Sequence, residues 1–415
     1  MRRFIMKSKW QKIKIGDYVS FQNGYAFKSK NFSDNGKYLV IRIKEIKDGI
    51  VKFFPDSARI NIEDETNFYK YKVEKGDILF ALTGDPVSRP NPLSWVGRIS
   101  IYNHKNPALL NQRVCKAIFD KNINPLFFYY YFRLYENFFD LARRATGSAN
   151  QANISTNTIL SMPIYLPSYS IQEKISNILK SLDDKIELNN QINKNLEQQA
   201  QAIFKNITDS NIAEEPLYKF IKIKHGYAFK GNFIQTIDNG VVLVTPGNFK
   251  LGGGFQENKC KFFNGEYPND YILNSGDLIV TMTDLSKDGD TLGYGALIPY
   301  DSQRIYLHNQ RIGLVKIYDN RLSKDYIYWY LRSYDYHNKI VGSASGTTVK
   351  HTSPTRILEQ NIPIPNKNCE YKIKSLSNID FMISRNDVEN IYLKQIRDLL
   401  IPKLMSGEID VYNFT

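Results

Sequence analysis

The chain of 415 residues carries the same pattern twice, and this duplication limits its possible folds more than any other feature. The motif GYAFK occurs at Gly24–Lys28 and again at Gly226–Lys230. The triplet NQR occurs at Asn111–Arg113 and again at Asn309–Arg311. Matches that keep their order over so long a spacing indicate two large repeats, because the repeats of a solenoid are shorter and more numerous.

Other segments follow the same order in both repeats. A Gly-Asp turn precedes an apolar run, an aromatic segment ends in arginine, and a Gly- and Ser-rich loop leads to a proline-containing exit. We therefore expect two copies of one domain. The paired segments are Gly76–Leu79 with Gly276–Ile279, Tyr129–Arg133 with Tyr328–Arg332, and the loops that begin at Gly147 and Gly342.

The first part of each repeat mixes strand-like and helix-like runs. Alternating or continuous apolar residues, with many β-branched and aromatic side chains, predict strands. Pro125 is typical of a first helical turn and predicts a helix from Pro125 to about Ala145. The predicted fold class is α/β (α+β), in two copies. The predicted strands of the first repeat are Tyr38–Ile43, Asp77–Thr83, Val96–Tyr102 and Gln112–Phe119.

The second part of each repeat reads as one long amphipathic helix. From Ile171 to Ile203 the seam positions recur in steps of four and three, without Gly or Pro, which predicts a coiled coil. Lys185, Asn189 and Gln199 are polar positions that weaken this seam and can fix its register. A two-fold relation between the repeats makes the expected helix pair antiparallel. The residues expected to pair the helices or to contact partners are Ile175, Ile178, Leu182, Asn189, Ile192, Leu196, Ile379, Ile383, Asn386, Leu393, Ile396 and Leu400.

The charge balance favours a polyanionic partner. Lys and Arg total 55 against 42 Asp and Glu, which gives a net charge of +13 and a pI near 9.3. Such an excess suits nucleic acid or an acidic membrane surface. No stretch approaches the roughly 18 apolar residues of a membrane span. The opening MRRFIMKSKW lacks the apolar core of a signal peptide, so we expect a cytoplasmic protein.

The sequence contains no convincing motif for catalysis, a metal or a cofactor. The three cysteines form no CxxC pair, and neither a phosphate loop nor a dinucleotide-binding glycine motif is present. Asp34 with Glu45–Lys47 can be aligned with a nuclease pattern, but a strand edge with solvated charges is the favoured interpretation. We expect no catalytic residues and no metal site.

The repeated motifs are rich in hydrogen-bond donors. Tyr25 and Lys28, like Tyr227 and Lys230, follow a glycine that can turn the backbone sharply. Lysine suits a phosphate, and the tyrosine hydroxyl suits a phosphate or a base; the alternative is that the aromatic rings anchor the loop in the core. The NQR triplet can pair with bases. Its identity in both repeats favours a structural or backbone-contact role, because readers of different sequences should differ where they read.

Two loops that differ between the repeats are better candidates for reading bases. Residues 83–89 align with 283–288, and residues 147–151 align with 345–351. Small residues permit close approach, and Asn, Gln, Arg and Lys supply donors for base edges. For each single residue, a solvated loop position is the alternative. The candidate DNA-binding residues are Tyr25, Lys28, Lys30, Thr83, Ser88, Arg89, Arg113, Ser148, Asn150, Gln151, Tyr227, Lys230, Thr283, Lys287, Arg311, Thr347, Lys350 and His351.

The combined layout resembles the specificity (S) subunit of type I restriction-modification systems across essentially the full chain. The features that carry the resemblance are a domain with a GYAFK opening, a Gly-Asp-Ile-Leu strand, an NQR strand and a GS loop ending in proline, followed by a long helix, all repeated. The tail Leu400–Ile409 is also similar to the C-terminal helix ending of that family.

The resemblance implies that each α/β domain is a target-recognition domain for one half of a bipartite double-stranded DNA site, with the helix pair setting the gap. It implies a non-catalytic subunit that carries two methyltransferase (M) subunits and restriction (R) subunits. S-adenosylmethionine, ATP and Mg then belong to the partners, and this chain holds no cofactor. The expected division is 1–167 and 211–367 for the two target-recognition domains, 168–210 for the first long helix, and 368–415 for the second long helix and tail.

Two other functions remain open at this point. A DNA-acting enzyme, such as a fused nuclease or methyltransferase with its own active site, predicts that the isolated chain modifies or cuts DNA. A coiled-coil scaffold for acidic proteins or membranes predicts binding that is insensitive to DNA sequence.

Overall fold

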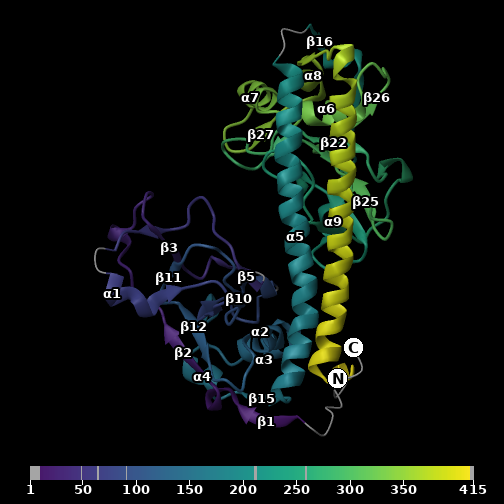
Figure 1. Ribbon diagram of the computed structural model, residues 1–415. Coiled ribbons are helices and arrows are strands. Elements are labelled where there is room, and N and C mark those ends of the chain that lie inside the picture. Colours follow the sequence, from purple (N-terminus) through teal and green to yellow (C-terminus); the bar gives the residue numbers. More distant parts are fainter. Residues whose placement is uncertain are drawn as a thin grey trace. The chain divides into compact units, whose positions relative to one another are not determined.

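The computed structural model describes residues 10–47, 49–62, 65–89, 91–209, 213–257 and 259–411 (Figure 1). The chain forms two compact units, one made of Met1–Lys185 with Leu393–Thr415 and the other of Ile186–Tyr392. Most of the opening segment on which the signal-peptide expectation rests lies outside the described residues. In the part of the chain that is described, no helix is long and apolar enough to cross a bilayer.

In its described residues, the first unit is built on four sheets and four short helices. A six-stranded sheet has the order β2 (Val19–Asn23), β12 (Val114–Phe119), β8 (Ile78–Ala81), β10 (Ile99–Ile101), β5 (Gly49–Val51), β4 (Ile46–Lys47). A four-stranded sheet has the order β6 (Arg59–Ile60), β3 (Tyr38–Ile41), β11 (Ala108–Leu110), β7 (Lys72–Val73). The smaller sheets are β1 (Gln11–Lys14) with β15 (Pro163–Leu166), and β13 (Thr146–Ser148), β14 (Gln151–Asn153) and β9 (Thr83–Gly84). The short helices are α1 (Glu65–Phe68), α2 (Pro125–Arg133), α3 (Tyr135–Ala142) and α4 (Thr156–Leu160).

The second unit has corresponding sheets and helices. A four-stranded sheet has the order β17 (Ile221–His225), β26 (Ile312–Ile317), β22 (Leu278–Thr281), β24 (Gly295–Leu297). A five-stranded sheet has the order β18 (Ile234–Gln235), β20 (Lys261–Phe263), β19 (Val241–Val244), β25 (Ile305–His308), β21 (Ile272–Leu273). The smaller sheets are β16 (Glu214–Pro216) with β28 (Asn361–Pro363), and β23 (Thr283–Asp284) with β27 (Lys350–His351). The short helices are α6 (Lys324–Tyr330), α7 (Tyr334–Gly342) and α8 (Pro354–Leu358).

The strand order confirms the duplication. The series β2-β12-β8-β10 in the first unit matches β17-β26-β22-β24 in the second. Each unit also has one parallel pair in its other large sheet, with Leu109 opposite Val40 and Tyr306 opposite Val242. The first unit adds the strands β5 and β4 at one edge of its larger sheet. The predicted α/β class and the four predicted strands are therefore confirmed.

The single helix predicted from Pro125 to about Ala145 is wrong, because the chain makes two helices there. Leu134 leaves the helical conformation, with φ −67° and ψ 124°, and separates α2 from α3. Asn137 bridges the break by donating to the carbonyl of Tyr131 over 2.9 Å. The second unit breaks at the same place, where Ser333 caps α7. The break is thus part of the repeated fold.

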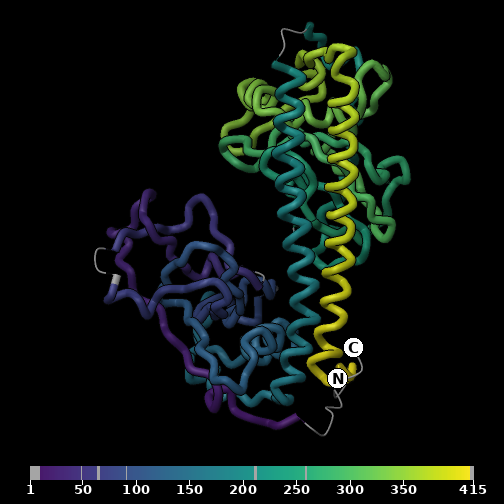
Figure 2. The backbone as a smooth tube through the Cα atoms, in the orientation of Figure 1, coloured from purple at the N-terminus to yellow at the C-terminus, as the bar shows by residue number. Residues whose placement is uncertain are grey.

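Two long helices, α5 (Tyr169–Thr208) and α9 (Glu370–Met405), contribute residues to both units (Figure 2). In the second unit, Asn189 pairs with Asn390 at 3.0 Å and Asn386 with Asn193 at 2.7 Å. In the first unit, Arg397 pairs with Asp183 at 2.7 Å. In the second unit the residue number rises along one helix as it falls along the other, so the predicted antiparallel pairing is confirmed there.

The predicted seam is partly out of phase with the buried face of α5. Lys185 and Gln199 are exposed, whereas the next residues, Ile186 and Ala200, are buried. The helices bury a wider face than a coiled-coil stripe because each also packs into the α/β core of its unit, and a 3.6-residue helix drifts away from a 3.5-residue repeat. The other predicted pairing residues are buried or half-buried, except Ile396, which is 46% exposed.

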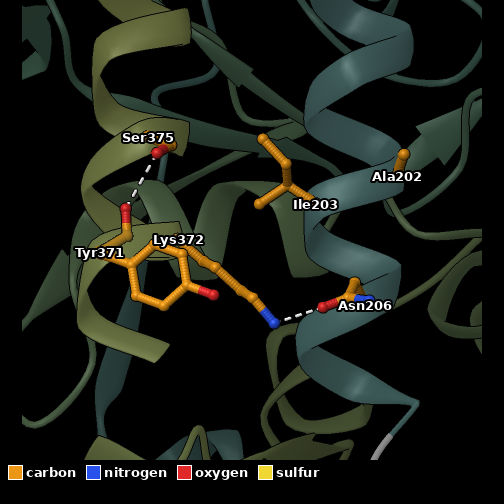
Figure 3. Close-up of a pocket in the computed structure, with 6 residues that line it drawn as sticks. All are labelled: Ala202, Ile203, Asn206, Tyr371, Lys372 and Ser375. Carbon is orange, nitrogen blue, oxygen red and sulfur yellow. Dashed lines mark hydrogen bonds between the residues drawn. The ribbon is translucent and has the colours of Figure 1, made fainter. Parts of the chain in front are cut away.

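An open groove lies between the two long helices in the second unit (Figure 3). Lys372 of α9 donates to the amide oxygen of Asn206 on α5 across this groove. Ser375 turns back to the carbonyl of Tyr371 on its own helix, at 2.9 Å. A polar bridge therefore joins the long helices here, beside the apolar cluster that contains Phe204 and Ile207 of α5 with Leu376 and Ile379 of α9.

A carboxylate on each long helix bonds to the aromatic helix of the same unit. Asp183 accepts from the hydroxyl of Tyr130 at 2.8 Å and from Arg397. Asp380 occupies the corresponding place in the second repeat and accepts from the indole of Trp329, with both oxygens at 3.1 Å. Burial is the main reason that the pKa of Asp380 rises to about 8, and nearby Asp325 adds to the rise. The two anchors are alike in position and differ in their neighbours, because Asp183 has Arg397 beside it and Asp380 has Asp325 nearby.

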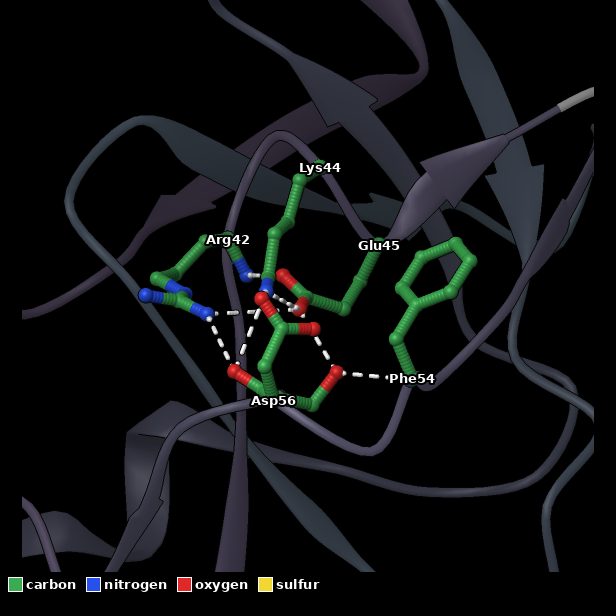
Figure 4. A network of polar contacts seen from close by, with 6 residues as sticks. Arg42, Lys44, Glu45, Phe54 and Asp56 are labelled. Atoms are coloured by element: carbon green, nitrogen blue, oxygen red, sulfur yellow. Dashed lines mark hydrogen bonds and ion pairs between the residues drawn. The ribbon is translucent and has the colours of Figure 1, made fainter. Parts of the chain in front are cut away.

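The nuclease-like alignment is not supported, and its favoured alternative holds only in part: β4 (Ile46–Lys47) is an edge strand and Asp34 is exposed. Glu45 is fully buried rather than solvated, and it accepts from the hydroxyl of Ser57 at 2.8 Å and the backbone of Arg42 at 3.0 Å (Figure 4). Lys44 bonds Asp56 at 2.7 Å in the same network. Within the described ranges, no group of three or more His, Cys, Asp or Glu side chains could hold a metal ion. Glu45 holds Arg42 and Ser57 together through these hydrogen bonds. A buried carboxylate is costly unless it accepts such bonds, so the role of Glu45 is structural.

Candidate nucleic-acid interface

The two repeated motifs bind each other through their backbones. In the first unit the amide of Tyr25 donates to the carbonyl of Leu110 at 2.9 Å, and the amide of Gln112 donates to the carbonyl of Tyr25 at 3.0 Å. In the second unit Tyr227 makes the same two bonds, to His308 at 2.8 Å and from Gln310 at 2.9 Å. GYAFK and NQR are therefore two halves of one structural element.

The glycine of GYAFK is required for a reason other than a sharp turn. A Cβ atom on Gly24 would lie 2.1 Å from the carbonyl oxygen of Asn111, and one on Gly226 would lie 2.1 Å from that of Asn309. Neither glycine is among those with positive φ. The turn explanation is wrong: these positions need glycine because the NQR backbone passes too close for any side chain.

The tyrosines of GYAFK are both packed and accessible. Tyr25 contacts the rings of Phe27 and Phe68 at 5.0 and 5.1 Å between centroids, and Tyr227 contacts Phe229 at 5.1 Å. Each tyrosine nevertheless keeps 41% of its surface exposed. The rings anchor the motif, and part of each ring stays accessible to solvent.

Both lysines of GYAFK are exposed. In the described part of the chain, neither the ammonium of Lys28 nor that of Lys230 has a hydrogen-bond or acidic partner. Lys30, Arg113 and Arg311 are exposed as well. Cations that are not neutralised by the protein can contact phosphates without first breaking an ion pair.

Backbone hydrogen bonds connect the NQR segment to the two loops that differ between the repeats. The carbonyl of Arg113 accepts from Leu82 at 2.9 Å, and the carbonyl of Leu82 accepts from Ile154 at 2.9 Å. In the second unit the carbonyl of Arg311 accepts from Met282, whose own carbonyl accepts from Thr352, both at 3.0 Å. One backbone pathway thus connects GYAFK, NQR and both divergent loops in each unit.

In the first unit the two divergent loops meet in one small sheet. Strand β14 pairs with β9 and with β13, so residues about 70 apart in sequence become neighbours. Arg89 donates to the amide oxygen of Asn150 at 2.9 Å and accepts through its carbonyl from the indole of Trp95 at 2.7 Å. The side chains of Ser88, Ser148 and Gln151 are exposed on these loops.

The second unit joins its divergent loops in the same way, through β23 and β27. Asp284 fastens the first loop by accepting from the amide of Ser286 and the hydroxyl of Thr291, each at 2.7 Å. Burial alone would raise the pKa of Asp284, but these hydrogen bonds outweigh it and hold the pKa below its usual value. Lys287, Thr347 and His351 are exposed, and Lys350 is half-buried.

The loop glycines correspond differently from the sequence alignment. Gly147 and Gly346 both have positive φ, and a Cβ on either would lie within 2.2 Å of a carbonyl oxygen across the hairpin. Gly342, which the shared GS dipeptide had aligned with Gly147, ends helix α7 instead. Gly147 therefore corresponds in structure to Gly346, which occupies the same place in its hairpin, and not to Gly342 of the shared GS dipeptide.

Sequence reasoning missed one feature of these loops. Thr83 and Thr283 are buried, at 1% and 4% exposed, and each holds a side chain of the second loop, Asn153 and His351 respectively. Asn153 was not among the candidate residues. The repeated Thr, present at the start of both otherwise different loops, was the signal that marked this position.

Known proteins with a similar sequence point to one kind of protein. Residues 7–198 match the model of the type I restriction modification DNA specificity domain. The MjaVIII specificity subunit of Methanocaldococcus jannaschii is 29% identical over 47% of this chain and 44% of its own length, so the chain spans less than half the length of that relative. The MjaIX specificity subunit of the same organism is 24% identical over 74% of each chain.

A solved structure agrees. The S subunit of a type I restriction-modification system from M. genitalium superposes with a TM-score of 0.56 over 96% of both chains, at 16% identity, which shows a common fold. The resemblance drawn from the sequence is confirmed as a similarity: residues 7–198 match the specificity-domain model, and these relatives are specificity subunits of type I restriction enzymes.

Proposed function

We propose that the chain is the non-catalytic subunit that selects a bipartite double-stranded DNA site. The observation that carries this proposal is the identical backbone frame in the two units, which holds two different sets of exposed loops. A common frame with different loops gives two readers with one geometry and two specificities. An enzyme with one active-site cleft would not require two copies of the same frame with different loops.

The domain division supports two separate readers. Residues 1–167 and 211–367 form the proposed target-recognition domains, and residues 168–210 and 368–415 form the proposed spacer helices and tail. Helix α5 has 40 residues, or roughly 60 Å at about 1.5 Å per residue. That length exceeds the ~34 Å repeat of a DNA duplex, which suits a spacer that sets the gap between half-sites.

The partners follow from the family. The proposed assembly contains two methyltransferase subunits and, for cleavage, restriction subunits, in the cytoplasm. S-adenosylmethionine, ATP and Mg would be held by those partners, with no cofactor in this chain. Two near-equivalent units offer two near-equivalent surfaces, which suits the binding of two identical subunits.

The proposed function is tested by mapping methylated adenines across a genome with and without this chain, in cells that contain the partner methyltransferase. We expect a two-part methylated motif that appears only when the chain is present. Exchange of residues 83–89 should change one half of that motif and leave the other half intact. Methylation or cleavage of DNA by the purified chain alone would instead support the enzyme alternative.

Substitution of Lys28 or Lys230 by alanine is expected to weaken binding to all DNA sequences alike. Each lost phosphate contact should reduce the slope of log K against log salt by about 0.9. Fluorescence anisotropy over a salt series measures both effects. Lys180→Ala is the control, because Lys180 lies on α5 and pairs with Asp184. Unchanged slopes for the first two variants would contradict phosphate contacts there.

A further inference from the structure

A buried threonine holds an outward side chain at the same place in both readers. The hydroxyl of Thr83 donates to the amide oxygen of Asn153 at 2.8 Å. The hydroxyl of Thr283 lies 3.2 Å from Nδ1 of His351. The strand register sets Thr83 opposite Asn153 and Thr283 opposite His351, so the two positions are equivalent. The threonine is the same in both units, and the side chain that it holds differs.

We propose that Asn153 and His351 are specificity-determining residues, each of which contacts a base in its own half-site; this rests on the function proposed above. Both side chains are accessible, since His351 is exposed and Asn153 is partly exposed. Along β14, Asn153 shares a face with exposed Gln151 while Ala152 between them is buried. The proposed base-contacting side chain of Asn153 therefore lies on the exposed face of the sheet formed by β13, β14 and β9.

The hydrogen bonds fix what each side chain offers to DNA. When Thr83 donates to the oxygen of Asn153, the NH₂ group remains free to donate. When the Thr283 hydroxyl donates to Nδ1 of His351, the proton of the neutral ring lies on Nε2 and points away from the threonine. Each reader thus presents an N–H donor for a purine N7, a guanine O6 or a thymine O4.

The amide of Asn153 and the imidazole of His351 differ in the bases that they can recognise. The amide has two donors and a second oxygen lone pair, which allows a bidentate pair with adenine. The imidazole has one outward donor and no outward acceptor, so it favours acceptor edges. A side chain that is held in place by a buried hydroxyl also loses less freedom on binding than one at a free loop tip.

The test uses the full chain with its methyltransferase subunits and reads the methylated motif genome-wide. His351→Asn should change base preference by about tenfold at one or two positions of one half-site, and Asn153→His should do so in the other half-site. Thr283→Val should relax the same positions as His351→Asn, because it keeps the shape and loses the hydroxyl. Thr281→Val is the matched control: it removes a buried hydrogen bond to the carbonyl of Thr283, at 2.9 Å, without touching His351, and should leave the motif unchanged.

The outcomes separate this inference from the function on which it rests. A two-part motif for the unmodified chain that stays identical in His351→Asn and Asn153→His overturns the inference alone. Equal changes in Thr283→Val and Thr281→Val also overturn it, since the hydroxyl would then act only on stability. Absence of any two-part motif with the unmodified chain overturns the proposed function itself. His351 is exposed, so its variant is expected to fold, and binding of the full chain to duplexes with altered half-sites gives a second measurement.

Discussion

Replacement of Gly226 by alanine is expected to destabilise the second unit by about 3 kcal/mol, at the upper end of what overpacking costs. The new methyl group would lie 2.1 Å from the carbonyl oxygen of Asn309 and 2.5 Å from that of His308. Relief of this clash would separate GYAFK from NQR and break the two backbone bonds that join them. Gly24→Ala should have the same effect on the first unit, through Asn111 and Leu110.

Hydrogen exchange measured by mass spectrometry on the full chain would locate the effect. Peptides from the affected unit should lose protection while those from the other unit keep it. Gly231→Ala is the matched control: it lies one residue after the same motif, has nothing within 4 Å of its Cβ position and has no positive φ. It should be neutral or slightly stabilising. Equal protection in Gly226→Ala and Gly231→Ala would contradict the close approach of the two motifs.

Replacement of Asp380 by asparagine is expected to make the chain more stable than the unmodified protein above pH 8. The pKa of Asp380 rises from near 3.8 to about 8 in the folded state, mainly through burial. Between these values the folded state holds a proton that the unfolded state releases, so stability falls as the pH rises, by up to about 1.4 kcal/mol per pH unit. Above pH 8 the loss is complete. Asparagine keeps an acceptor for Trp329 and does not titrate.

Urea denaturation of both proteins at several pH values between 5 and 9 measures this difference. The stability advantage of Asp380→Asn should be small at pH 5 and grow as the pH rises. Asp183→Asn is the matched comparison, because Asp183 has Arg397 beside it whereas Asp380 is buried with Asp325 nearby. That variant should be less stable by about 2 kcal/mol near neutral pH, since it removes a charged hydrogen-bond partner. A pH-independent difference for Asp380→Asn would show that Asp380 is ionised throughout.

The duplication made the architecture predictable. Two copies of GYAFK and NQR required two copies of one domain, and the seam of Ile and Leu residues required long helices. The break at Leu134 had no local signal in the first repeat, although Ser333 is a recognisable helix cap in the second. The phase of α5 was misjudged because its buried face is decided by the α/β core as well as by α9.

The site was predictable in its segments and not in its assembly. The sequence comparison selected both divergent loops, but strand pairing across about 70 residues, which joins them, follows no local pattern. The buried threonines were assigned as readers because a hydroxyl in a variable loop looks accessible in sequence. Glu45 was assigned to solvent for a similar reason, since its partner Ser57 comes from another part of the chain.

The discontinuity of the first unit has a consequence for biosynthesis. Ile401, Leu404 and Met405 belong to the same apolar cluster as Phe127 and Phe128, so that cluster stays incomplete until Met405 has left the ribosome. The second unit is one uninterrupted stretch and can close as soon as Tyr392 emerges. The unit that contains Met1–Lys185 therefore finishes folding after the unit Ile186–Tyr392, although most of it is translated earlier.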